Sequence, residues 1–302
     1  MGAALMWLAA LQLAGVVVFG LAALVEVGLR RQSAAARRGV WALAIAVALV
    51  LPLARLALPA PAQMPARWLA GPLLAIWAAG ALLLLARAVR AHAGARSRVA
   101  RSHALAATSW QVMRDALREP TARPRVCLRV SCEIDAPQTI GILRPVILVP
   151  PAMLAAPAPA QRAALAHELA HVARADCLLR LAGAVARAIY WISPLPWWAL
   201  RRLRAHAEEA ADDAALGAGV PSSSYAALLV AVARDRLERV GRVAADGLRE
   251  RVRGILDARR IRSRAPRWSV PGLVGFAVLL ATMATACEAR SGETAAHERA
   301  KN

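Results

Sequence analysis

Long apolar runs separated by arginine-rich segments dominate the pattern of hydrophobic and polar positions along this 302-residue chain. The first run is interrupted only by Gln12 and Glu26. A helix needs about 20 mostly apolar residues to cross a hydrocarbon layer of about 30 Å, and each run is close to that length. We therefore predict about four transmembrane helices, at residues 5–29, 40–59, 68–86 and 269–287.

The distribution of arginine predicts how these helices are oriented. Segments 30–38, 87–101 and 249–267 are rich in Arg, whereas the proline-rich loop 60–67 contains a single Arg. Basic residues beside membrane helices mark the cytoplasmic side. The pattern predicts a multi-pass protein of the cell (inner, cytoplasmic) membrane, with both termini outside and residues 87–267 mainly in the cytoplasm.

Composition supports a membrane protein and argues against a nucleic-acid binder. Hydrophobic residues make up 59% of the chain, the mean hydropathy is +0.44 and the net charge is +20. Such a charge is also typical of nucleic-acid binding, but here the arginines cluster beside apolar runs and no helix-turn-helix pattern accompanies them. We predict the lipid bilayer as a partner and no direct nucleic-acid binding, with attraction of 249–267 to acidic lipid as an accessory effect.

Between the third and fourth runs the pattern predicts a mixed helical and strand region. Residues 103–119, 201–216 and 222–242 have helical patterns, and 125–150 contains β-branched runs that predict two or three short strands. The apolar segment 178–200 is broken by prolines and rich in Trp, which indicates a position within or at the membrane interface rather than a full span. The expected units are a membrane domain (1–88), a cytoplasmic α+β domain with a small sheet (89–267), and a fourth span with a short tail (268–302).

Residues 163–177 carry the clearest chemical signal. The stretch is rich in Ala and Leu and lacks Gly and Pro, so it predicts a helix. His167 and His171 then lie one turn apart on one face, and Glu168 follows the first histidine. This is the H-E-x-x-H pattern, in which two imidazoles hold Zn²⁺ and the glutamate acts as general base toward water.

A zinc site of this kind needs a third protein ligand, and an acidic cluster 37 residues past His171 offers one. On a helix, Glu208 and Asp212 share a face, as do Glu209 and Asp213. Asp212 could hydrogen-bond a ligating histidine and select its tautomer. From the residues alone, nearby His206 remains a rival ligand and a solvated acidic face remains an alternative.

From about residue 137 to 235 the sequence resembles the BlaR/MecR-type membrane zinc metallopeptidases. The resemblance rests on five motifs: Thr139–Pro150 (TIGILRPVILVP), His167–His171 (HELAH) with Asp176, Pro194–Trp198 (PLPWW), Glu208–Asp213 (EEAADD) and Pro221–Tyr225 (PSSSY). It implies a mainly α polytopic protein with a zincin-like cytoplasmic peptidase domain. It also implies Glu208 as third ligand, with Asp212 and Asp176 supporting the ligands.

The resemblance implies a substrate and also has limits. By likeness, the chain is a zinc endopeptidase that cleaves a cytoplasmic transcriptional repressor, and itself, in response to a signal. The antibiotic sensors of this family carry an extracellular penicillin-binding domain after the fourth span, whereas only fifteen residues follow residue 287 here. The alternative function is a non-catalytic membrane scaffold with structural zinc, and the presence of Glu168 argues against it because a structural site needs no base. The sequence also allows a homodimer.

Overall fold

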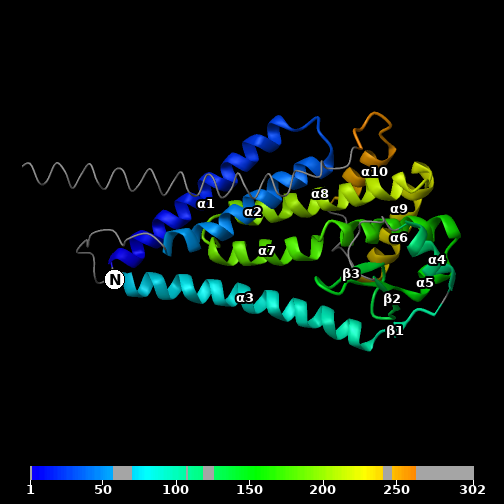
Figure 1. The fold of residues 1–302 in the computed structure, drawn as a ribbon, viewed down its shortest axis with the longest axis horizontal. Helices are drawn as coiled ribbons and strands as arrows, with labels where there is room; N and C mark the ends of the chain where they lie inside the picture. Colours follow the sequence, from blue (N-terminus) through cyan, green and yellow to red (C-terminus); the bar gives the residue numbers. More distant parts are fainter. Residues whose placement is uncertain (1, 57–69, 107, 118–125, 241–246, 263–302) are drawn as a thin grey trace, which may run out of the picture.

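The computed structural model describes residues 2–56, 70–106, 108–117, 126–240 and 247–262 (Figure 1). Long helices run lengthwise along the molecule, and the sheet and the shorter helices gather at one end. The described helices are α1 (Gly2–Gly28), α2 (Ala34–Leu56), α3 (Ala70–Arg101), α4 (Thr108–Leu117), α5 (Pro151–Leu154), α6 (Ala158–Ala173), α7 (Asp176–Ile189), α8 (Leu195–Gly217), α9 (Ser222–Val240) and α10 (Leu248–Leu256).

Helices α1, α2 and α3 each contain a segment long and apolar enough to cross a membrane. These segments are Ala4–Gly28, Ala34–Ala54 and Gly71–Arg101, which agrees with the first three predicted spans. The fourth predicted span, 269–287, and the proline-rich loop 60–67 lie outside the described residues. The chain is therefore a membrane protein, and the orientation and domain boundaries inferred from its arginines stay predictions.

Two arginine-rich segments differ from the prediction, which assigned them to loops. Helix α3 continues through residues 87–101, because this stretch consists largely of Ala and Arg, both strong helix formers, and contains no proline. Helix α2 already begins at Ala34, so Arg37 and Arg38 lie in its first turns. The basic residues therefore extend the membrane helices toward the rest of the protein.

A four-stranded mixed sheet lies beside the short helices, in the order β1-β2-β4-β3. The strands predicted within 125–150 are β2 (Cys127–Val130), β3 (Gln138–Ile140) and β4 (Val146–Val149), with β2 parallel and β3 antiparallel to β4. The prediction of a helix over 103–119 is wrong at its start. His103 and Ala104 form β1, whose backbone pairs with β2, and the helix begins only at Thr108.

A glycine allows the tight connection between β3 and β4. Gly141 has φ +101°, and a Cβ there would lie 2.5 Å from the carbonyl oxygen of Arg144. Only glycine adopts this conformation without strain and without a clash. The turn returns the chain so that β3 becomes an edge strand next to α6, with its outer edge free of any described strand.

Helix α6 is buried along its second half, from Ala163 to Val172. One side packs on the sheet through Leu165 and Leu169, and another packs on α8 through small residues such as Ala163 and Ala166. Helix α8 also presents alanines, at positions 207, 210, 211 and 215, all buried. Because helix separation depends on the side chains at the contact, these alanines let α6 and α8 approach closely.

Helices α7 and α8 form a hairpin whose turn lies against the apolar helices (Figure 1). The Tyr190 hydroxyl donates to the carbonyl of Ala48 (2.8 Å), while Trp77 and Gln12 both donate to the carbonyl of Ile189 (3.0 Å each). The break predicted by the prolines is thus the hairpin turn. Its insertion into a bilayer stays a prediction.

Candidate metal centre

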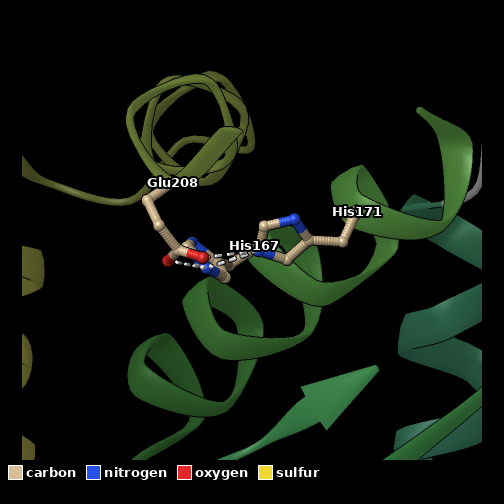
Figure 2. Close-up of side chains that lie close together, drawn as sticks. All are labelled: His167, His171 and Glu208. Atoms are coloured by element: carbon tan, nitrogen blue, oxygen red, sulfur yellow. Dashed lines mark hydrogen bonds and ion pairs between the residues drawn. The ribbon is translucent and has the colours of Figure 1, made fainter. Parts of the chain in front are cut away.

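Two histidines from α6 and one glutamate from α8 converge on one point (Figure 2). The Nε2 atoms of His167 and His171 are 3.1 Å apart, and the Glu208 carboxylate oxygens lie 3.5 Å from Nε2 of His167 and 3.6 Å from Nε2 of His171. Both imidazoles are buried, whereas the Glu208 side chain is 37% exposed. The helical spacing of the histidines and the alanine contact between α6 and α8 together build this triangle.

The triangle has the dimensions of a zinc site. A tetrahedral ion with bonds of about 2.0–2.2 Å holds its ligand atoms about 3.3–3.6 Å apart. The three separations given above are close to that range. Two nitrogens and one carboxylate oxygen are also donors that zinc accepts, and three protein ligands leave one position open. The residues therefore fit a zinc ion bound by His167, His171 and Glu208.

Asp176 holds His171 from behind. Its Oδ2 lies 2.7 Å from Nδ1 of His171, so Nδ1 carries the proton and Nε2 is left as an acceptor facing the triangle. A left-handed residue makes this contact possible: Ala175, at φ +52°, is the one non-glycine residue with positive φ among the described residues. That conformation costs about 1 kcal/mol, and it ends α6 and turns Asp176 back toward the histidine.

Asp212 and Tyr225 play the corresponding part for His167. The Tyr225 hydroxyl donates to Oδ1 of Asp212 (2.7 Å) and lies 3.0 Å from Nδ1 of His167, which is itself 3.2 Å from Asp212. Arg251 of α10 binds both oxygens of Asp212, at 2.8 and 2.7 Å, and lies 3.2 Å from Glu208. Asp212 thus organises an imidazole, a phenol and a guanidinium at once.

Glu168 lies next to the triangle and is held by the sheet. The Thr139 hydroxyl, on edge strand β3, donates to its carboxylate (2.7 Å). Glu168 and Thr139 are both buried, and both line a cavity of about 320 Å³ that the two histidines and Glu208 also line. Glu168 is therefore placed beside the candidate metal position in a space that a substrate can enter.

The pairing of His167 with its neighbouring carboxylates shifts the pKa values of His167 and Glu208 in opposite directions. Burial alone would lower the pKa of His167, but the carboxylates of Asp212 and Glu208 outweigh burial and raise it to about 10. Burial would raise the pKa of Glu208, and the hydrogen bond and charge of His167 bring it down to about 2 instead. The carboxylates therefore stabilise a positive charge at this point, and a divalent cation can take the place of the proton.

The structure brings together His167, His171 and Glu208, the three residues predicted as ligands. His206, the rival ligand, faces away: its Nε2 lies 2.6 Å from Glu26 of α1. Sequence reasoning missed the contacts of Arg251 and Thr139 and the contact of Tyr225 with His167. Tyr225 and Thr139 stood in the compared motifs without a role, whereas nothing in the basic run 249–267 distinguishes Arg251 from its neighbours.

Comparison with known proteins agrees with this geometry. The sequence profile described as BlaR1 peptidase M56 matches residues 53–253. The regulatory protein BlaR1 of Bacillus licheniformis is 32% identical over 92 residues, which are 30% of this chain and 15% of that protein. The alignment thus spans a small part of that relative. The profile, however, covers most of this chain, including the apolar helices α3 and part of α2, the sheet and the histidine–glutamate triangle. The chain belongs to the BlaR1 peptidase M56 family of membrane metallopeptidases.

Proposed function

We propose that this protein is a zinc endopeptidase in which His167, His171 and Glu208 bind the metal and Glu168 is the general base. The observation that carries the proposal is the convergence of the three ligand atoms beside a second, separately held carboxylate in one cavity. A structural zinc site needs neither an open ligand position nor a base beside it. This argues against the alternative of a non-catalytic scaffold.

The residues around the metal position divide the chemical work. A bound zinc ion would polarise the scissile carbonyl and lower the pKa of water. Glu168 takes the proton from the attacking water and later delivers it to the leaving amine. The hydrogen bond from Thr139 keeps the Glu168 carboxylate oriented toward the cavity, so that no reorientation is needed during proton transfer.

The cavity walls indicate how a peptide would bind. One wall is the edge strand β3, which has no described strand on its outer side, so an extended substrate could pair with it there. Apolar side chains also line the cavity, namely Leu228, Leu229 and Val232 from α9 and Met153 from α5. These features favour an extended polypeptide with an apolar side chain beside the cleaved bond.

We further propose that the peptidase faces the cytoplasm and acts on a transcriptional repressor, and on itself, as the output of a signal. Two observations support this: the arginine-rich segments flank the ends of α1, α2 and α3 nearest the metal site, and the relative from Bacillus licheniformis is a regulatory protein. A reporter active only in the cytoplasm should be active when fused after residue 160. Silence at that position would exclude a cytoplasmic substrate.

The catalytic role is tested with Glu168→Gln in purified full-length protein. The substitution removes the base but no metal ligand, so zinc content should be retained while cleavage of a quenched-fluorescent peptide library falls by at least about 100-fold. Glu133→Gln is the matched control, because this glutamate is exposed and paired only with Arg101 among its described ion pairs. Equal cleavage by parent and Glu168→Gln would refute the proposed mechanism.

A further inference from the structure

Arg38, in the second turn of membrane helix α2, extends into the metal centre. Its Nε donates to Oδ1 of Asp176 (2.8 Å), and its Nη2 donates to the same oxygen and to the backbone carbonyl of Arg174 (2.7 Å). Arg38 is 8% exposed and Asp176 3% exposed. This guanidinium therefore comes from 138 residues away in sequence to the junction between α6 and α7.

Asp176 divides its two oxygens between Arg38 and a metal ligand. Oδ1 accepts from Arg38, and Oδ2 lies 2.7 Å from Nδ1 of His171. The carbonyl of Arg174, which Arg38 also binds, lies directly before the left-handed Ala175 that aims Asp176 at the histidine. Arg38 thus holds both the carboxylate and the backbone turn that carries it.

The preceding residue reaches the other side of the site. Arg37 donates to Oε2 of Glu209 (3.1 Å), and Glu209 follows the ligand Glu208 on α8. Adjacent arginines at the start of α2 therefore contact the α6–α7 junction, which supports His171, and α8, which carries Glu208. Helix α1 contacts α8 one turn earlier, through Glu26 and His206.

We propose that Arg38 is a positioning residue of the metal centre, which fixes the orientation of His171 through Asp176 and thereby ties the site to the membrane helices. The inference rests on the proposed zinc function. A buried ion pair rarely adds more stability than apolar residues of similar volume, so its two-point geometry is better explained by orientation. Arginine suits this role because its planar fork binds a carboxylate and a carbonyl together, which lysine cannot do. A displacement of α2 relative to α7 would consequently reach His171.

The test is the zinc affinity of full-length protein in detergent, measured by competition with a chromophoric chelator. Loss of an outer partner of a ligating histidine weakens metal binding by about 10–100-fold. Asp176→Asn should fall in this range, and Arg38→Gln, one contact further out, should weaken zinc binding by about tenfold. Arg38→Lys should recover part of the loss. Arg31→Gln replaces an exposed arginine in the connection between α1 and α2 and should bind zinc as the parent does.

A double-mutant cycle separates positioning from general destabilisation. If Arg38 acts through Asp176, adding Arg38→Gln to Asp176→Asn should change zinc affinity by less than about twofold. The absorption spectrum of the cobalt-substituted protein should also shift in Arg38→Gln and return toward the parent in Arg38→Lys. If Arg38→Gln fails to fold, the double-mutant cycle and the cobalt spectrum are measured with Arg38→Lys instead.

Two results would overturn the proposal while leaving the zinc function intact. The first is a folded Arg38→Gln protein whose zinc affinity and cobalt spectrum are the same as those of the parent. If Arg38→Gln does not fold, the same result in Arg38→Lys would count equally. The other is full additivity of the Arg38 and Asp176 substitutions. A parent protein that binds no zinc would instead contradict the proposed function itself, and with it the role of Arg38.

Discussion

Replacing Asp212 tests how strongly the outer contacts support the metal centre. Asp212 is 3% exposed and accepts three hydrogen bonds, two from Arg251 and one from Tyr225, while Nδ1 of His167 lies 3.2 Å away. Asp212→Ala removes every one of these contacts at once. It also leaves the guanidinium of Arg251, whose side chain is 22% exposed, without its two-point partner.

The expected magnitudes follow from this geometry. Removing one partner of a buried ion pair costs about 3–5 kcal/mol, and the partial exposure of Arg251 places Asp212→Ala near the lower end, at about 3 kcal/mol. Zinc affinity should fall by about 10–100-fold, because His167 loses its orienting carboxylate. Asp212→Asn keeps an oxygen for Tyr225 but loses the charge that Arg251 requires, so its effects should lie between those of the parent and of alanine.

The assay compares apparent unfolding temperature and zinc affinity in the same detergent. Asp213→Asn is the matched control, since Asp213 is the next residue on α8 and pairs at 3.6 Å with Arg260 and Arg262, away from the ligands. The control should keep the zinc affinity of the parent. If Asp212→Asn bound zinc as the parent does, or if Asp213→Asn weakened binding equally, the supporting role of Asp212 would be refuted.

Three further predictions concern the ligand, the base and the hairpin. Glu208→Ala should weaken zinc binding by more than about 100-fold, beyond the loss of an outer partner, whereas His206→Ala should leave it unchanged; the reverse result would reassign the third ligand. Thr139→Val should keep zinc and lower cleavage by about tenfold, since hydrogen bonds to charged groups contribute about 1.5–3 kcal/mol. Thr139→Ser should restore cleavage. Equal cleavage by the parent, Thr139→Val and Thr139→Ser would exclude a role of Thr139 in orienting Glu168. Ile192 lies at the hairpin turn and is 57% exposed in the protein alone, so Ile192→Cys should resist a water-soluble maleimide in membranes and react once the protein is denatured. Exposed Cys132, tested as the single cysteine, should react both in membranes and after denaturation. Labelling of Ile192→Cys in membranes would place the turn in water.

Local patterns in the sequence were sufficient for the parts of the site that lie on one element. The spacing of His167 and His171 places both imidazoles on one helical face, whatever surrounds that helix. The choice between Glu208 and His206 is different, because both lie on α8 and their directions depend on how that helix packs. The structure turns His206 toward Glu26 and Glu208 toward the histidines.

Contacts between distant segments had no local signal. Arg38 and Arg251 are two of many arginines, and each finds its partner only after the chain has folded, 138 and 39 residues away respectively. The same abundance misled the prediction for residues 87–101, where charge indicated a loop although Ala and Arg are strong helix formers. The long apolar runs, by contrast, predicted three membrane helices well, since length and hydropathy alone define them.

The central claim, that His167, His171 and Glu208 bind a zinc ion, is tested most directly by metal analysis combined with zinc X-ray absorption on the purified protein. We predict about one zinc per chain, with two imidazole nitrogens and oxygen in its coordination shell and no sulfur. The His167→Ala/His171→Ala double variant should contain none. A zinc content that is the same in parent and double variant, or a shell containing sulfur, would contradict the account.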